Sequence, residues 1–269
     1  MIKRSKESPP FYIGWMPKSA GEYRGFTRLV IFALVVVCVF VAALLVSNQR
    51  GFSSGVYERT NITELEGLLI AKPFPAIKTF FGKDIYGNPV TKTILLVNKG
   101  KFGADSLVAR MIKSSGNDVW VKVKGRLIYN HGAALMELAN EDSAIHTMET
   151  LSKATKIPEV KIMELGNTTL HGQIVDPKCY LGVMKPGEGK PHSDCAIRCI
   201  AGGIPPLLKI RNDQGEETFF ILRGENGETI NKQVLPYVGI PVAITGTVES
   251  ADDWFIVKLN PSTGIKTEN

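Results

Sequence analysis

The sequence Val-Lys-Val-Lys-Gly-Arg-Leu-Ile-Tyr at residues 121–129 opens a block that ends at Leu138, and this block has a counterpart near the C-terminus. The counterpart begins Val-Ala-Ile-Thr-Gly-Thr-Val at residues 242–248 and ends at Leu259, so the two blocks are equally long, and both have glycine in the fifth position. In both blocks apolar and polar side chains alternate around a central polar turn, which is typical of a β-hairpin. The chain is therefore expected to contain one small β-structure twice.

Two earlier pairs of segments match in the same order. Glu-Gly-Leu-Leu-Ile at residues 66–70 resembles His-Gly-Gln-Ile-Val at 171–175. Thr-Ile-Leu-Leu-Val at residues 93–97 resembles Thr-Phe-Phe-Ile-Leu at 218–222. A strand, a loop, a second strand, a short helix and then a strand that enters a hairpin is an order that resembles an OB-fold, a five-stranded Greek-key barrel.

The short helix of each copy is expected at residues 106–113 and 229–237. The predicted fold class is mainly β, with one N-terminal transmembrane helix followed by two tandem small OB-like barrels.

A connecting helix is expected at residues 143–156, and the end of the chain after Asn260 is expected to be frayed. The predicted segments are a cytoplasmic tail at 1–28, a transmembrane helix at 29–47, a linker at 48–60, a first barrel at 61–140, a connector at 141–165, a second barrel with a Cys/His loop at 166–260 and a tail at 261–269.

Residues 29–46 form an unbroken apolar run without a charge, which is long enough to cross a bilayer as a helix. Six lysines and arginines precede this run, and Arg50 is the one basic residue between it and Glu58. The positive-inside rule therefore places the N-terminus in the cytoplasm and the rest outside. A cleaved signal peptide is the competing interpretation, but the run exceeds the usual apolar core of about 7–15 residues. We expect a single-pass anchor in a bacterial inner (plasma) membrane, with the C-terminal domains in the periplasm.

The second copy is longer than the first. The interval from Gly172 to Gly246 clearly exceeds the corresponding interval from Gly67 to Gly125. The additional residues are assigned to a Cys/His-containing loop after the first strand of the second copy. In OB-folds the loop between strands one and two borders the ligand-binding face. The added loop therefore falls where such barrels bind their ligands.

Four residues of this loop are candidate metal ligands: Cys179, His192, Cys195 and Cys199. The last three are spaced by three and four positions, so a helix would align them along one side, with Cys179 reaching back from the preceding loop. Ser193 or Asp194 is expected to cap that helix, and Gly202-Gly203 to end it. Three sulfurs and one imidazole suit a tetrahedral site for zinc, copper or iron. His171, at the start of the first strand of this copy, is an additional candidate ligand.

The same cysteines have a second interpretation. In an exported domain, Cys179 paired with Cys195 or Cys199 would form a structural or redox-active disulfide, and the remaining thiol would be free. A neighbouring Lys178 or Arg198 would make such a thiol more reactive. A third interpretation is a structural scaffold whose loop docks onto a partner. The spacing is not that of a zinc finger, since the sequence has no Cys-x-x-Cys pair.

Several catalytic and binding classes have no signature in this sequence. It contains no P-loop, no Gly-x-Ser-x-Gly elbow, no His-Glu-x-x-His motif, no Rossmann fingerprint and no Cys-x-x-Cys-His haem attachment site. The net charge of +6 is partly concentrated near the N-terminus, and no aromatic-interleaved basic cluster follows, so we expect no nucleic-acid partner. No catalytic residue is assigned, and a binding protein is favoured over an enzyme.

The string Asp176-x-Lys178-Cys179, His192-x-x-Cys195-x-x-x-Cys199 and Gly202-Gly203-Ile204-Pro205-Pro206 resembles one in uncharacterised bacterial membrane-anchored proteins with an exported OB-like barrel. This resemblance covers about the last hundred residues and implies a fold and a candidate site. The layout is also similar to that of the haem chaperone of cytochrome c maturation, but the His-Asp-Glu-x-Tyr motif of that family is missing.

These patterns together predict a membrane-anchored, extracytoplasmic accessory protein that binds a soft metal or a redox centre. Its expected partners are the lipid bilayer and a membrane or periplasmic redox complex. The alternatives are a thiol–disulfide redox protein that uses the same cysteines and a docking scaffold with a disulfide-stapled loop.

Overall fold

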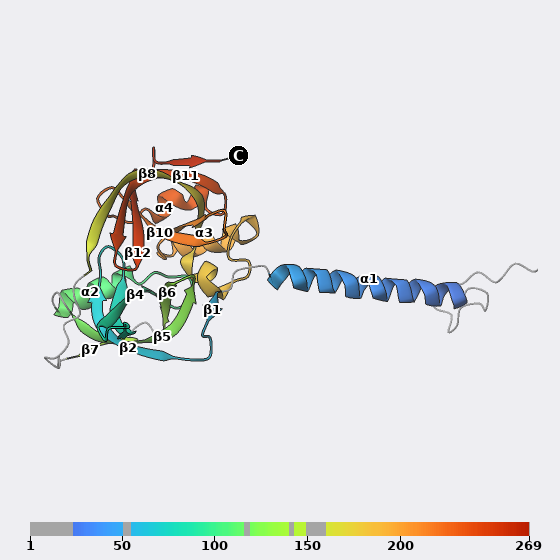
Figure 1. The fold of residues 1–269 in the computed structure, drawn as a ribbon, viewed down its shortest axis with the longest axis horizontal. Helices are drawn as coiled ribbons and strands as arrows, with labels where there is room; N and C mark the ends of the chain where they lie inside the picture. Colours follow the sequence, from blue (N-terminus) through green and yellow to red (C-terminus); the bar gives the residue numbers. More distant parts are fainter. Residues whose placement is uncertain (1–23, 51–54, 116–118, 140–142, 149–159, 269) are drawn as a thin grey trace, which may run out of the picture. The chain divides into compact units, whose positions relative to one another are not determined.

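The computed structural model describes residues 24–50, 55–115, 119–139, 143–148 and 160–268 of the chain. It is mainly β-structure with one long N-terminal helix (Figure 1). The chain divides into two compact units, Met1–Phe52 and Ser53–Asn269.

The first unit contains the helix α1 (Arg24–Arg50). Within its segment Arg24–Asn48, an 18-residue window has a mean hydropathy of 3.5, and none of that window is buried inside the protein. An apolar helix of this length can cross a bilayer, and a signal sequence has the same properties. The predicted apolar span at residues 29–47 is therefore helical. The cytoplasmic tail predicted before it lies, up to residue 23, outside the described residues.

The first sheet of the second unit forms a closed barrel. Strand β2 pairs with β3, β3 with β4, β4 with β6, β6 with β5, and β5 again with β2. The β4–β6 pairing is parallel and the others in this circuit are antiparallel, as in an OB-fold. The elements are β1 (Val56–Tyr57), β2 (Thr63–Ile70), β3 (Ala76–Lys83), β4 (Pro89–Val97), α2 (Asp105–Ser115), β5 (Trp120–Asn130), β6 (Ala133–Leu138) and β7 (Ile145–Thr147).

The predicted helix at residues 106–113 is confirmed by α2, which lies between the third and fourth strands of this barrel. Strands β1 and β7 are additions that pair with β5.

The second sheet has the strand order β12-β10-β9-β8-β11-β13, with an additional pairing between β11 and β12. Its β10–β12 pairing is parallel. The elements are β8 (Ile162–Val175), β9 (Leu207–Arg211), β10 (Glu217–Gly224), α4 (Asn231–Val234), a 3₁₀ turn η4 (Leu235–Tyr237), β11 (Pro241–Ala251), β12 (Trp254–Leu259) and β13 (Ile265–Thr267). Helix α4 and η4 lie within the range where a short helix was predicted, residues 229–237.

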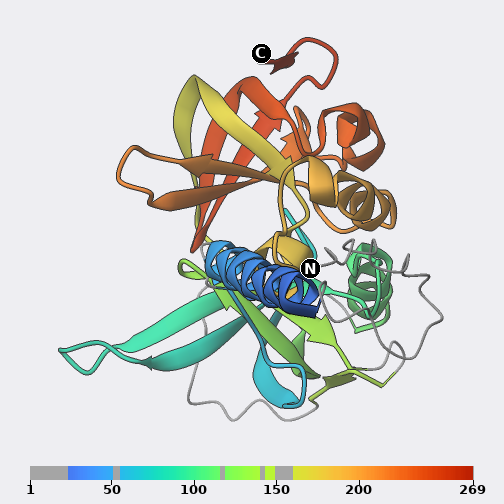
Figure 2. The ribbon, with the colours of Figure 1, turned by 90° about the vertical axis from the view of Figure 1, so that its right-hand side faces the viewer.

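The long connection between β8 and β9 carries the cysteines and His192. It contains a π-helical turn η2 (Cys179–Val183), a 3₁₀ turn η3 (Lys190–His192) and the helix α3 (Ser193–Ala201). In the first barrel, residues 71–75 make the equivalent connection. The additional residues of the second copy thus lie between its first and second strands, β8 and β9, as the spacing of the glycines predicts. Figures 1 and 2 show part of this connection between the strands of the two sheets.

A shared hydrophobic core holds the two sheets together. Phe74 and Leu95 from the first barrel lie in one buried cluster with Tyr180 and Trp254. The Trp254 indole N–H donates a hydrogen bond of 2.9 Å to the carbonyl oxygen of Thr93. Each sheet also has an apolar core of its own. The Cys/His connection is packed into the shared cluster as well, because its residues Cys179 and Cys199 belong to it.

Two expectations about secondary structure are wrong. Residues 145–147 form strand β7, not part of a helix, because Ile145 pairs with Val123 and its side chain is buried. The rest of the predicted helix, residues 149–156, lies outside the described residues. The C-terminal tail is not frayed over residues 265–267, because β13 pairs with β11 and buries Ile265.

Candidate metal-binding site

Cys179 is positioned by the turn that follows strand β8. The buried Asp176 carboxylate accepts hydrogen bonds from the backbone N–H groups of Lys178, at 3.0 Å, and Cys179, at 3.3 Å. The N–H of Met184 then donates to the Cys179 carbonyl oxygen at 3.0 Å, the wide hydrogen-bonding pattern of a π-helix. Such π-helical turns occur often at functional sites. The thiol of Cys179 is held in the protein interior by this short, locally bonded segment.

His192 and Cys195 come from the start of helix α3. His192 ends the 3₁₀ turn η3 and is the N-cap residue of α3, and Cys195 follows in the first turn. The prediction that Ser193 or Asp194 caps this helix is wrong: no side chain among the described residues caps it, and the Ser193 hydroxyl donates to the carbonyl oxygen of Lys190 at 2.9 Å. The predicted helix end is confirmed, since Gly202 is the C-cap residue.

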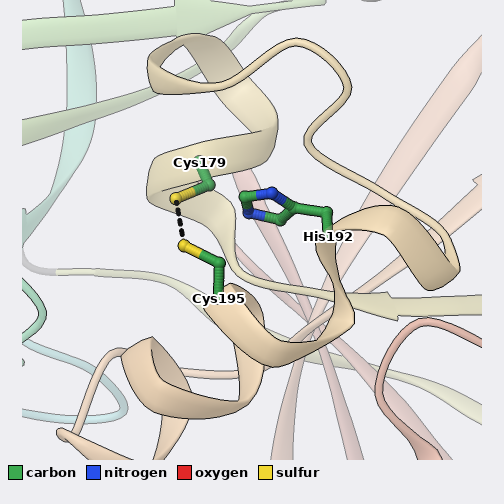
Figure 3. Close-up of side chains that lie close together, drawn as sticks. All are labelled: Cys179, His192 and Cys195. Atoms are coloured by element: carbon green, nitrogen blue, oxygen red, sulfur yellow. Dashed lines mark hydrogen bonds between the residues drawn. The ribbon is translucent and has the colours of Figure 1, made fainter.

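The structure brings Cys179, His192 and Cys195 together. One ligand atom from each lies within 4.8 Å of the other two. The two sulfur atoms are 4.0 Å apart. Figure 3 shows the side chains converging from η2 and from the start of α3. Cys179 and His192 are buried and Cys195 is half-buried, so the cluster sits just below the surface.

Cys199 joins the cluster through Cys179. Its sulfur lies within 4.8 Å of the Cys179 sulfur and of an Asp176 carboxylate oxygen. Cys199 lies one helical turn beyond Cys195 and is buried. The four predicted ligand residues therefore form two overlapping groups that share Cys179, and a carboxylate lies beside the second group.

The His192 imidazole is in the form that binds metals. Burial lowers its pKa, the positive charge of Lys101 lowers it further, and the negative charge of Asp176 opposes both effects. The ring is therefore neutral at pH 7. Its Nε2 atom is buried without a hydrogen-bond partner among the described residues. A buried imidazole nitrogen without a partner is costly, and a metal ion would satisfy it.

The pKa of the Cys179 thiol is raised by its hydrogen bond with Cys199, by burial and by the nearby Asp176 carboxylate. Cys179 is therefore protonated at pH 7 when no metal ion is bound. A metal ion would reverse this, because a metal-bound thiol loses its proton.

Lys101 brings a positive charge to the cysteines from the first barrel. Its Nζ lies 3.0 Å from the Cys195 sulfur and 3.8 Å from the Cys199 sulfur. Lys101 could not be found from the sequence, because it is 94 positions from Cys195 and no local pattern marks it. Asp176 was part of the quoted motif, but its role in holding Cys179 could not be recognised without the turn geometry.

All four cysteines of the chain lie in described segments, and all four are free thiols, so the structure pairs none of them in a disulfide. The separation of 4.0 Å between the Cys179 and Cys195 sulfurs is about twice a disulfide bond of about 2.05 Å. Cys38 is exposed on helix α1 and belongs to the other unit.

His171, the additional candidate ligand, does not point into the site. Its ring is 65% exposed and its Nδ1 atom lies 2.5 Å from the Glu268 carboxylate.

Comparison with known proteins adds nothing to this geometry: no protein-family model, no curated protein and no solved structure matches the chain.

Proposed function

We propose that this chain is a membrane-anchored accessory protein that binds one soft metal ion through Cys179, His192 and Cys195, with Cys199 as the fourth ligand. The observation that carries the proposal is the convergence of two sulfurs and one unpartnered imidazole within 4.8 Å. Cys179 comes from η2, His192 from the end of η3 and Cys195 from the first turn of α3. Hydrophobic packing alone does not require a buried imidazole at this place, whereas a metal ion would use it.

The distance between the sulfurs fits a metal site. In a tetrahedral centre with metal–sulfur bonds of about 2.3 Å, two sulfur ligands lie about 3.8 Å apart. The Cys179 and Cys195 sulfurs are 4.0 Å apart. The donor set of thiolates and imidazole suits zinc, copper(I) or iron(II) and disfavours magnesium and calcium, which prefer oxygen.

Asp176 is assigned a supporting role rather than that of a ligand. Both of its carboxylate oxygens accept backbone N–H bonds that hold the turn around Cys179. Outer residues of this kind orient the ligands of a metal and typically affect affinity by about 10- to 100-fold.

We also propose that the second sheet is a second OB-like barrel, related to the first by duplication. Its pairings follow the same circuit, with β8, β9, β10, β12 and β11 in place of β2, β3, β4, β6 and β5. Glycines occupy matching close approaches: a Cβ on Gly67 or on Gly172 would lie 2.2 Å from a carbonyl oxygen of the next strand. The metal site then occupies the connection that borders the ligand face in OB-folds.

The proposed location is a bacterial inner membrane, with α1 as a single-pass anchor and the barrels on the periplasmic side. The length and hydropathy of α1 and the basic residues before it support this orientation. The proposed partner is a membrane or periplasmic redox complex, to which a soft-metal protein at this surface would deliver metal or electrons.

A thiol–disulfide protein is the second candidate, favoured by the closeness of three thiols and of the Lys101 ammonium. In that case two thiols would lose two electrons and two protons to an external disulfide and form an S–S bond. The two functions differ in what the purified protein contains, which is a bound metal ion in the first case and a disulfide in the second.

The test is metal analysis of the full-length protein, extracted in detergent and purified without oxygen. The proposal expects about one equivalent of zinc, copper or iron per chain, and loss of that metal in Cys179→Ser and Cys195→Ser variants. Cys38→Ser is the matched control, because Cys38 lies on α1, outside the cluster, and should keep the metal. Absence of these metals from the wild type, together with a disulfide between two cluster cysteines, would replace the proposal with the second candidate.

A further inference from the structure

Lys101 belongs to the first barrel, whereas the candidate metal ligands belong to the connection in the second sheet. It lies between β4 and α2, and its ammonium is 3.0 Å from the Cys195 sulfur and 3.8 Å from the Cys199 sulfur. The side chain is half-buried. One flexible lysine near one sulfur would mean little, but this one contacts both cysteines that helix α3 contributes.

The backbone around Lys101 is held in place. The N–H of Gly103 donates to the Gly202 carbonyl oxygen at 3.1 Å, directly after helix α3. The chains pass so closely that a Cβ on Gly202 would lie 1.9 Å from the carbonyl oxygen of Lys101. On the other side, Lys178 donates to the carbonyl oxygen of Gly100 at 2.6 Å. The segment that carries Lys101 is thus fixed to both ends of the Cys/His connection.

Charge explains why a cation is needed there. A divalent metal bound by three thiolates and a neutral imidazole carries a net charge of −1, and a monovalent metal carries −2. The buried Asp176 carboxylate adds further negative charge beside Cys179. Burying uncompensated charge is unfavourable. Lys178 is nearby, but its ammonium is directed at Glu137, at 2.6 Å.

We propose that Lys101 is a specificity-determining residue of the metal site: its ammonium neutralises the thiolate-rich loaded centre and hydrogen-bonds its sulfurs. This inference rests on the proposed metal-binding function and deepens it. Hydrogen bonds to charged acceptors are roughly twice as strong as those to neutral ones. Lys101 therefore stabilises the centre most when a metal is bound by thiolates, and it favours ions that are bound as anionic thiolate complexes.

The test uses Co²⁺ as a probe, titrated anaerobically into the metal-free full-length protein in detergent. Co²⁺ bound by thiolates has a sulfur-to-metal charge-transfer absorption, which reports affinity and sulfur bonding together. Lys101→Met should weaken Co²⁺ binding about 10- to 100-fold, the effect of losing a hydrogen bond to a charged group. The absorption should also move to lower energy, because the sulfur electrons lose the stabilising N–H group.

Two further variants make the result specific. Lys101→Arg keeps the charge and should retain most of the affinity. Lys99→Met is the matched control, because Lys99 is exposed in the same segment and should bind Co²⁺ as the wild type does. If Lys101→Met does not fold, as judged by circular dichroism, Lys101→Gln takes its place.

The outcomes separate the two proposals. Wild-type affinity and an unchanged absorption band in a folded, neutral Lys101 variant would overturn the role of Lys101 and leave the metal site in place. Failure of the wild type itself to develop a sulfur-to-cobalt band would refute the metal site.

Discussion

The ammonium of Lys178 lies 2.6 Å from the carboxylate of Glu137, and both side chains are buried. The same ammonium donates to the carbonyl oxygens of Asn98, at 3.2 Å, and Gly100, at 2.6 Å. Lys178 immediately precedes Cys179, whereas its three partners belong to the first barrel. This contact therefore ties the turn that carries a candidate ligand to the neighbouring barrel.

Removing one member of this pair should be costly. Lys178→Met leaves the Glu137 charge buried without its partner, so we expect the free energy of unfolding to fall by about 3–5 kcal/mol. Urea unfolding followed by tryptophan fluorescence measures it. Lys122→Met is the control, since Lys122 pairs with Glu66 at 2.8 Å but is 36% exposed, and it should lower the free energy of unfolding far less. An equal fall in the free energy of unfolding in Lys178→Met and Lys122→Met would contradict the buried ion pair between Lys178 and Glu137.

Glu217 should make the protein sensitive to acid. Its side chain is 3% exposed and accepts hydrogen bonds from the Tyr180 hydroxyl, at 2.7 Å, and from Arg211. Burial alone would raise the pKa of Glu217, but the hydrogen bonds from Tyr180 and Arg211 and the nearby positive charges outweigh it and lower the pKa. A carboxyl group whose pKa is lowered in the folded state stabilises the protein at pH values above its unfolded-state pKa of about 4.3. This contribution disappears as the pH falls through the pKa of the folded state.

Glu217→Gln should therefore lower the free energy of unfolding at pH 7 by about 1.5–3 kcal/mol. The difference from the wild type should shrink as the pH falls from about 4.3, the unfolded value, through the lowered pKa of Glu217, where the wild-type carboxyl group also becomes neutral. Thermal unfolding of both proteins between pH 3 and 7 measures this, with the exposed Asp213→Asn as the control. A difference that does not change with pH would exclude the role assigned to the Glu217 charge.

Gly103→Ala should disturb both stability and metal binding. A Cβ at Gly103 would lie 2.0 Å from the backbone carbonyl oxygen of Gly203, so the segment carrying Lys101 must move away from the end of α3. Overpacking of this kind costs about 1–3 kcal/mol. We expect lower Co²⁺ affinity as well, because Lys101 moves away from the cysteines. Lys99→Ala, in the same segment, is the control. A Gly103→Ala variant with wild-type stability and affinity would show that this close approach does not hold the segment.

Metal binding should stabilise the folded protein. A ligand that binds only the folded state at 100 times its Kd adds about 2.7 kcal/mol to the free energy of unfolding. Zn²⁺ should therefore raise the unfolding temperature of the metal-free protein, and a chelator should reverse the effect. Cys179→Ser should abolish the increase, whereas Cys38→Ser should retain it. An identical increase in the Cys179→Ser variant would mean that Zn²⁺ acts elsewhere.

The sequence predicts those features that local patterns determine. The apolar run at residues 29–46 specifies a helix by its length and composition, and the glycine spacing locates the added connection between β8 and β9. The spacing of His192 and Cys195 also places both side chains at the start of one helix.

Features that depend on distant contacts were not predictable. Residues 143–156 have helical spacing, but pairing with β5 makes residues 145–147 a strand. The polar C-terminal tail has little strand propensity, yet the edge of β11 pairs with it. Lys101 has no motif of its own and becomes relevant only because the two sheets pack together.

The central claim is that the cysteine sulfurs of this cluster and the His192 imidazole bind one metal ion. X-ray absorption at the metal edge of the anaerobically purified, metal-loaded protein tests it most directly. The proposal predicts a shell of sulfur atoms at about 2.3 Å together with one imidazole nitrogen at about 2.0–2.1 Å. The imidazole signal should disappear in His192→Ala. A first shell made only of oxygen and nitrogen, unchanged in Cys179→Ser, would contradict it.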